Sequence, residues 1–339
     1  MIELSELHDA AQKAFPADKL IPARDESWKL VAEMGWLMIE LPENDGGLGL
    51  GRDAAVAINY ELGKVLSAAP LIPALLGLRG IVGAADLADR AVWIERICGG
   101  EYVPLNMLPG KVENADGALS GTVSGVFEAD LASHVLIGGG GSYTLVPVDA
   151  PGVTLIERPI WDRSRRLFDV KLDGFKADPT LVLASGEAAQ TLHDDIARSA
   201  HLFLAADSLG GADAALAMTI EYLKVRKQFD RPLAMFQALK HRCADLKTRI
   251  VATEALLWSR ARAPEAGSVV DLGALKGLAT DVYRHVTEEA VQLHGGIGLT
   301  DEHPCHLYLK RALLNLQLCG SLDLWREATG RQTLAEMPA

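Results

Sequence analysis

The chain has 339 residues, of which 49% are hydrophobic and 23% charged, and its formal net charge is −12. This length favours two or three packed subdomains over one small core. The negative charge argues against a nucleic-acid partner, because binding to phosphate requires a basic face.

The cysteines are Cys98, Cys243, Cys305 and Cys319, and no two of them form a CxxC pair. Such wide spacing is typical of reduced thiols in a cytosol rather than of a disulfide framework or a zinc site. The first residues, MIELSELHDAAQKAF, are amphipathic and acidic, which is not typical of a signal peptide. We therefore expect a soluble, cytoplasmic protein.

The first segment, residues 1–101, is expected to be a helical domain. Its apolar run at 66–85 contains Pro70, Pro73 and Arg79, which favours a buried helical hairpin over a membrane span. The glycine-rich stretch at 41–51, LPENDGGLGLG, predicts an exposed turn. A phosphate-binding loop would need a lysine and a preceding strand, and both are missing here.

The pattern changes to a two-residue period in the segment 102–183. Phe168, Val170 and Leu172 alternate with Asp169, Lys171 and Asp173, which is typical of a half-buried strand that ends in a turn at 173–174. We therefore expect a small middle β-domain here.

A helical period returns in the segment 184–339. Long helices are expected at 186–226, 236–262, 267–294 and 302–316, and their lengths favour an antiparallel four-helix bundle. The fold class predicted for the whole chain is therefore α+β, with a helical domain, a β-domain and a helical bundle in that order.

The loop after the first of these helices combines residues that suit a nucleotide. Arg226 lies at a helix C-terminus and can bind phosphate through its guanidinium group. Gln228 offers an amide and Phe229 a ring for stacking, and Gln237 opens the next helix. From the chemistry alone, a helix–turn–helix corner with a capping arginine and two core phenylalanines is the simpler interpretation.

The second loop holds Gln292, Gly295, Gly296 and Gly298 within the sequence QLHGGIGLTDEHP. Adjacent glycines let backbone N–H groups approach a ligand closely. A helix C-cap explains Gly295 alone, but not the whole set.

Several histidines surround this loop, namely His285, His294, His303 and His306, with Cys305 between the last two. A tetrahedral zinc site usually has tighter pairs of ligands than these spacings give. No metal site is predicted.

Taken together, three stretches resemble conserved blocks of the acyl-CoA dehydrogenase family. RKQFDRPLAMFQALKHRCADL at 226–246 is similar to the family's R-x-x-F-G-x-x-L/I-x-x-F-Q block. QLHGGIGLTDEHPCHLYLKRA at 292–312 is similar to its Q-x-x-G-G-x-G-x-x-x-E-x-P block. The turn at 41–51 resembles its P-E-x-x-G-G-x-G turn, and the order of domains agrees.

The resemblance implies FAD as the cofactor. In the family, one subunit holds the flavin and its neighbour holds the adenosine-diphosphate end. The positions that match the latter site are Arg226, Gln228, Phe229, Gln237, Gln292, Gly295 and Gly296.

The departures from the family pattern concern the catalytic half of the site. The flavin-contacting T-E-P-x-x-G-S-D segment is missing after Glu101, where the chain reads YVPLNMLPGKVENADG. The two positions at which family members carry the catalytic glutamate are occupied by Ala200 and Cys319, and His201 stands where an arginine is usual. No catalytic residue is therefore predicted in this chain.

The resemblance thus points to the smaller, base-lacking subunit of a heterotetrameric (α₂β₂), steroid-type acyl-CoA dehydrogenase. A homologous partner would supply the flavin pocket, the catalytic glutamate and most of the acyl-CoA site. One alternative is a self-sufficient homotetramer that uses Cys319 or Asp207 as its base. Another is a flavin-free scaffold or regulatory protein.

Overall fold

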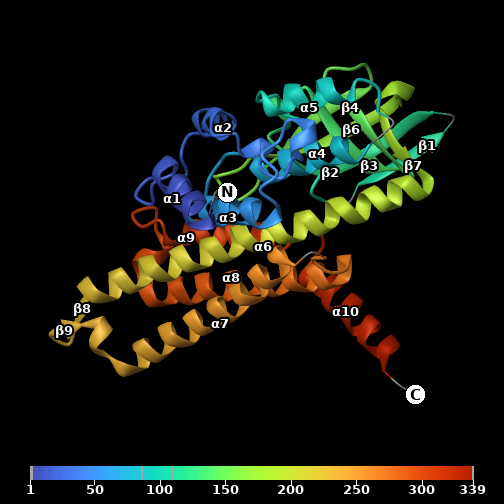
Figure 1. Cartoon of the computed structure of the whole chain (residues 1–339). Helices are drawn as coiled ribbons and strands as arrows, with labels where there is room; N and C mark the ends of the chain where they lie inside the picture. The colour runs from blue at the N-terminus through green and yellow to red at the C-terminus, as the bar shows by residue number, and fades with distance from the viewer. Residues whose placement is uncertain (1–2, 85–86, 109, 116, 264, 338–339) are drawn as a thin grey trace. The chain divides into compact units, whose positions relative to one another are not determined.

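The computed structural model describes residues 3–84, 87–108, 110–115, 117–263 and 265–337. The chain forms two compact units (Figure 1). The first, called here the helical unit, comprises Met1–Pro22, Val56–Ser67 and His201–Ala339. The second, the mixed unit, comprises Ala23–Ala55 and Ala68–Ala200.

The mixed unit combines short helices with two antiparallel sheets. Its helical elements are α2 (Arg24–Glu33), η1 (Trp36–Met38), η2 (Glu43–Asp45), α4 (Leu71–Gly83), α5 (Arg90–Cys98), η3 (Ala129–Leu131) and η4 (Pro179–Leu181). The helices α3 (Arg52–Lys64) and α6 (Gly186–Val225) contribute residues to both units.

The apolar run at 66–85 forms one buried helix, α4, rather than a helical hairpin. Residue 85 lies outside the described part of the chain. Glycine is required on this helix, because a Cβ at Gly77 would come within 1.9 Å of the Val103 carbonyl oxygen. This close approach packs the helix against the segment that leads into the first sheet.

The strands of the mixed unit form two antiparallel sheets. The four-stranded sheet has the order β1-β2-β6-β5, and the three-stranded sheet has the order β3-β4-β7. Their strands are β1 (Lys111–Ala115), β2 (Ala118–Phe127), β3 (His134–Gly139), β4 (Ser142–Pro147), β5 (Val153–Arg158), β6 (Leu167–Lys176) and β7 (Val182–Ser185).

The predicted turn at 173–174 is wrong, because β6 continues through it. Leu119 and Gly121 on β2 pair with Phe175 and Leu172 on β6, so a step of two residues on one strand faces a step of three on the other. The extra residue makes a β-bulge, and Gly174 takes a φ of +62° within it. A bulge and a turn share the same glycine signal in sequence.

The helical unit contains the predicted long helices, with α6 only in part, together with α1 and α10. Its elements are α1 (Leu4–Ala14), β8 (Lys227–Gln228), β9 (Arg231–Pro232), η5 (Leu233–Met235), α7 (Gln237–Arg262), α8 (Val269–His294), η6 (Gly295–Leu299), α9 (Cys305–Asn315) and α10 (Leu322–Glu336). The helix α10 was not predicted, since none of its residues is buried.

Among the described residues, α6 is the one helix long and apolar enough to cross a membrane, and 72% of its most apolar window is buried inside the protein. Burial of that kind is typical of a core helix.

We keep the division into domains at 1–101, 102–183 and 184–339 as a proposal. The element types change near those borders, between Cys98 and Lys111 and again between Ser185 and Gly186. The compact units follow other borders, because residues near the N-terminus group with the C-terminal helices.

Candidate functional site

The first predicted loop is a β-hairpin, β8–β9, at the tip where α6 passes into α7 (Figure 1). The Leu233 N–H donates to the Arg226 carbonyl at 2.8 Å and closes its base. Its two loop residues, Phe229 and Asp230, have φ values of 54° and 61°. Two successive positive φ values are typical of a type I′ hairpin turn.

Phe229 at the tip of this hairpin is 86% exposed. The interpretation of a corner with two core phenylalanines is therefore wrong for Phe229. A bulky residue in the left-handed region is uncommon and is worth a functional explanation. Its ring meets Phe236 edge to face at a centroid distance of 6.2 Å, and the Arg231 guanidinium lies 4.0 Å from the centre of that second ring.

Arg226, Gln228 and Gln237 are all exposed around the same hairpin. Gln237 is the first residue of α7, as expected. Asp230 stands where the family block has glycine, and aspartate tolerates this backbone conformation better than most residues. The departure from the family pattern therefore preserves the turn.

The second predicted loop begins where α8 ends. Gly295 has a φ of +65°, and a Cβ added at Gly295 or Gly296 would find no atom within 4 Å. Internal packing thus does not require glycine at Gly296, and the space beside both residues is open. Gln292, one turn earlier, is exposed.

Tyr222 joins the two loops. Its hydroxyl donates to the His294 carbonyl at 3.2 Å, and its ring stacks on the His294 imidazole at a centroid distance of 4.4 Å. Tyr222 lies four residues before Arg226, and His294 lies directly before Gly295. The fold therefore brings together the segments that carry Arg226 and Gly295. Nothing in the sequence pattern pointed to Tyr222.

These residues fit the adenosine-diphosphate end of a dinucleotide. The cation of Arg226 suits a diphosphate, the exposed ring of Phe229 offers a stacking face, and open glycine backbone lets a phosphate approach. The set lies on an exposed surface, whereas bound cofactors are largely enclosed by protein.

Neither expected position of a catalytic base offers one. Ala200 is a buried methyl group on α6. Burial raises the pKa of the Cys319 thiol to about 11, so the thiol stays protonated at neutral pH. The carbonyl of Cys319 accepts from the Trp325 indole N–H at 3.1 Å and from the Nε2 of His201 at 3.3 Å.

A buried lysine also stabilises the turn that carries Cys319. The ammonium of Lys276 donates to the carbonyls of Gly320 at 2.8 Å and Leu316 at 3.2 Å. Burial lowers the pKa of Lys276 to about 8. The turn that carries a glutamate in many family members is thus held here by hydrogen bonds to its backbone.

Asp207, the other residue weighed as a base, is engaged on both carboxylate oxygens. Oδ1 accepts from Arg311 at 3.3 Å, and Oδ2 accepts from the Asn315 amide at 2.7 Å. Asp207 and Arg311 are 3% and 1% exposed. A carboxylate held in this way serves the core and does not face a substrate.

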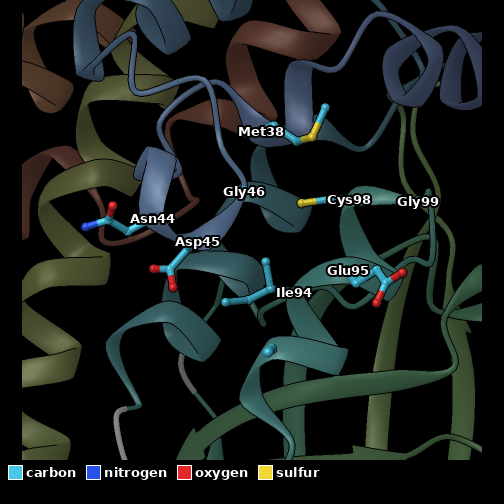
Figure 2. A pocket seen from close by; sticks show the side chains of 9 residues that line it. Met38, Asn44, Asp45, Gly46, Ile94, Glu95, Cys98 and Gly99 are labelled. Atoms are coloured by element: carbon cyan, nitrogen blue, oxygen red, sulfur yellow. The ribbon is translucent and has the colours of Figure 1, made fainter.

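A separate cavity of about 450 Å³ lies in the mixed unit, between the turn at 44–46 and helix α5 (Figure 2). The carboxylates of Asp45 and Glu95 and the sulfur atoms of Met38 and Cys98 line it. Asp45 forms an ion pair with Arg90 at 2.9 Å. The cavity contains none of the predicted cofactor residues.

One cluster appears only in the folded chain. The metal-binding atoms of His294, His303 and Cys305 all lie within 4.8 Å of one another. From the sequence these residues were set aside as zinc ligands because of their spacing, but in the structure the turn before α9 brings their metal-binding atoms together.

Comparison with known proteins identifies the class. Residues 5–101 match the N-terminal domain of acyl-CoA dehydrogenases, and residues 199–334 match their C-terminal domain. The chain belongs to the acyl-CoA dehydrogenase family, whose members are FAD-binding oxidoreductases that act on CH–CH bonds.

Particular relatives narrow this class. The chain is 34% identical to acyl-CoA dehydrogenase IpdE2 of Mycolicibacterium smegmatis, over 86% of this chain and 83% of that protein. It is 33% identical to IpdE2 of Mycobacterium tuberculosis, with 88% and 83% covered.

Two solved structures share the fold over almost the whole chain. The steroid acyl-CoA dehydrogenase Tcur3481-Tcur3483 has a TM-score of 0.84 at 26% identity, with 98% of each chain covered. The ChsE4-ChsE5 complex of Mycobacterium tuberculosis has a TM-score of 0.82 at 25% identity, with 99% and 97% covered.

Proposed function

We propose that this protein is the base-lacking subunit of a heteromeric acyl-CoA dehydrogenase. It holds the adenosine-diphosphate end of FAD, and a homologous partner supplies the flavin pocket and the catalytic glutamate. The complex desaturates the α,β bond of a CoA thioester, and the steroid enzyme among its structural relatives favours a steroid side-chain or ring-derived acyl group.

One observation carries this proposal: neither family position for the base offers a carboxylate. Removal of the α-proton of an acyl-CoA needs a positioned general base within reach. Ala200 has no titratable group, Cys319 is a protonated thiol, and Asp207 is committed to Arg311. FAD bound in the complex would supply the acceptor for the β-hydride.

The residues that this chain contributes bind and orient the cofactor. Arg226 would hold the diphosphate, Phe229 would stack on the base, and Gln228, Gln237 and Gln292 would donate or accept hydrogen bonds around them. Gly295 and Gly296 leave the backbone open to the phosphates. None of these side chains moves a proton in the reaction.

Exposed apolar side chains beside the two loops support a partner subunit. Single exposed apolar residues are ordinary, but several around one site indicate an interface. Those nearest in sequence to the loops are Val225 (74% exposed), Phe229 (86%), Met235 (58%) and Leu299 (73%). The structural relatives named with two components, Tcur3481-Tcur3483 and ChsE4-ChsE5, also support a partner subunit. We propose an α₂β₂ assembly in the cytoplasm.

Expression of this chain alone and together with a homologous partner that has the glutamate tests the proposal. We expect little FAD and no dehydrogenase activity from the chain alone, and a yellow, active complex from coexpression. A purified homo-oligomer with full flavin content and acyl-CoA turnover would disprove the assignment. A coexpressed complex without flavin absorbance would instead favour a scaffold.

Arg226→Ala tests the cofactor site within that complex. We expect it to lower the FAD content, because the diphosphate loses its cationic partner. Lys224→Ala is the matched control, since Lys224 lies on the same helix end and its ammonium pairs with Glu221 at 2.6 Å. Equal flavin content in both variants would remove Arg226 from the site.

A further inference from the structure

The cluster of His294, His303 and Cys305 lies beside the proposed cofactor loop but is not used by it. His294 is the last residue of α8, and Cys305 is the first residue of α9. His303 lies in the turn between them. These side chains come from three separate points of a short stretch, and the fold turns their metal-binding atoms toward one another.

His294 has the hydrogen-bond arrangement of a metal ligand. It is 3% exposed, and its Nδ1 lies 2.7 Å from the Ala290 carbonyl oxygen, so Nδ1 carries the proton and donates it. Nε2 therefore holds a lone pair, and it is buried with no hydrogen-bond partner among the described residues. A buried polar atom left in this state costs free energy. Metal-bound histidines typically donate their other ring N–H to a carbonyl in this way.

His303 and Cys305 complete the set. The Cys305 backbone N–H donates to the Nδ1 of His303 at 3.2 Å, so the lone pair of that nitrogen is engaged in this hydrogen bond, which a metal bound through Nδ1 would replace. The two imidazole rings lie 4.3 Å apart between centroids, with no hydrogen bond between them. Cys305 is 1% exposed, so its sulfur is a buried ligand.

We propose that His294, His303 and Cys305 bind a divalent transition-metal ion, with zinc as the best match. Two imidazoles and one thiolate suit a metal of intermediate softness. Zinc bonds of about 2.0–2.3 Å place tetrahedral ligands roughly 3.5 Å apart. Side-chain rotations that move the ligand atoms by about an ångström bring them to this distance. Water takes the fourth position.

Metal binding at this site involves no change of oxidation state. The S–H bond of Cys305 breaks, the sulfur–zinc bond forms, and the proton leaves to solvent. Burial holds the pKa values of both histidines below the ordinary range, so these ligands are neutral. The ion would fasten the end of α8 to the start of α9 and so fix the intervening glycine loop.

Cobalt(II) titration of the purified full-length chain, followed by competition with zinc, tests this site. We expect one cobalt per chain and a thiolate-to-cobalt charge-transfer band in the near ultraviolet, which zinc abolishes. His294→Gln and Cys305→Ala should each weaken binding by about tenfold or more. Cys305→Ala should also remove the band. The matched control, Cys243→Ala, changes a half-buried thiol on α7 and should change neither.

Binding without the charge-transfer band, or binding unchanged in Cys305→Ala, would overturn the proposal, as would the absence of any stoichiometric binding. Far-ultraviolet circular dichroism checks that each variant folds. If Cys305→Ala does not fold, His294→Gln decides the question, since loss of affinity supports the site and full affinity refutes it. The measurement involves neither flavin nor acyl-CoA, so it stands apart from the proposed function.

Discussion

At the scale of single residues, the turn that carries the catalytic glutamate in many family members serves a structural role in this chain. The turn at 316–320 presents its backbone carbonyls to Lys276, His201 and Trp325. Lys276 itself is fully buried. A buried ammonium is tolerated because carbonyl oxygens surround it, and its depressed pKa records the remaining cost of desolvation.

Lys276→Met should therefore change how stability depends on pH. The pKa of Lys276 falls from 10.5 to about 8 on folding, so between these values the unfolded chain holds a proton that the folded chain has lost. As the pH increases through that window, the free energy of unfolding of the native protein should rise relative to that of the Met variant, by up to roughly 3 kcal/mol. Urea unfolding of both proteins at several pH values measures this difference. A constant difference would show that Lys276 keeps its ordinary pKa.

At the scale of elements, α6 and α9 are joined through a buried polar pair within the helical unit. Arg311 on α9 donates to Asp207 on α6, and it also donates to the carbonyls of Leu66 and Ser67. Asn315, one turn along α9, binds the other oxygen of Asp207. Burial of both charges makes the removal of either partner costly.

Arg311→Met should destabilise the protein by about 3–5 kcal/mol, because it leaves the Asp207 carboxylate buried without its countercharge. Chemical denaturation gives the value. Arg331→Ala is a matched control on α10, where the pair with Glu327 is largely exposed and should contribute at most about 1 kcal/mol. Similar losses in the two variants would contradict a structural role for the buried pair.

At the scale of the whole molecule, periodicity predicted most of the fold. The long helices and the small β-region were expected because runs of apolar residues at helical or alternating spacing leave few other solutions. Helix α10 escaped prediction because none of its residues is buried. The bulge at Gly174 escaped because a positive φ serves turns and bulges alike.

The candidate site was less predictable than the fold. The family-like sequence blocks predicted Arg226, Phe229 and Gly295 as cofactor-binding residues, and these roles remain predictions. The blocks could not show that Tyr222 links the two loops. Nor could they show that Asp207 is tied to Arg311, since residues more than a hundred positions apart meet only through helix packing. Contacts of this kind depend on tertiary structure and leave no local pattern.

The helical unit is assembled from stretches that are far apart along the chain. His8 pairs with Glu61 at 2.7 Å, Ile21 N–H donates to the Val65 carbonyl at 3.0 Å, and the Tyr308 hydroxyl donates to the Lys64 carbonyl at 2.6 Å. A fragment that begins at the C-terminal helices would lack the carbonyls of Lys64, Leu66 and Ser67, which accept from Tyr308 and Arg311. This unit therefore cannot be inherited, exchanged or expressed as one continuous piece, and any recombination between relatives must keep the beginning and the end of the chain from the same parent.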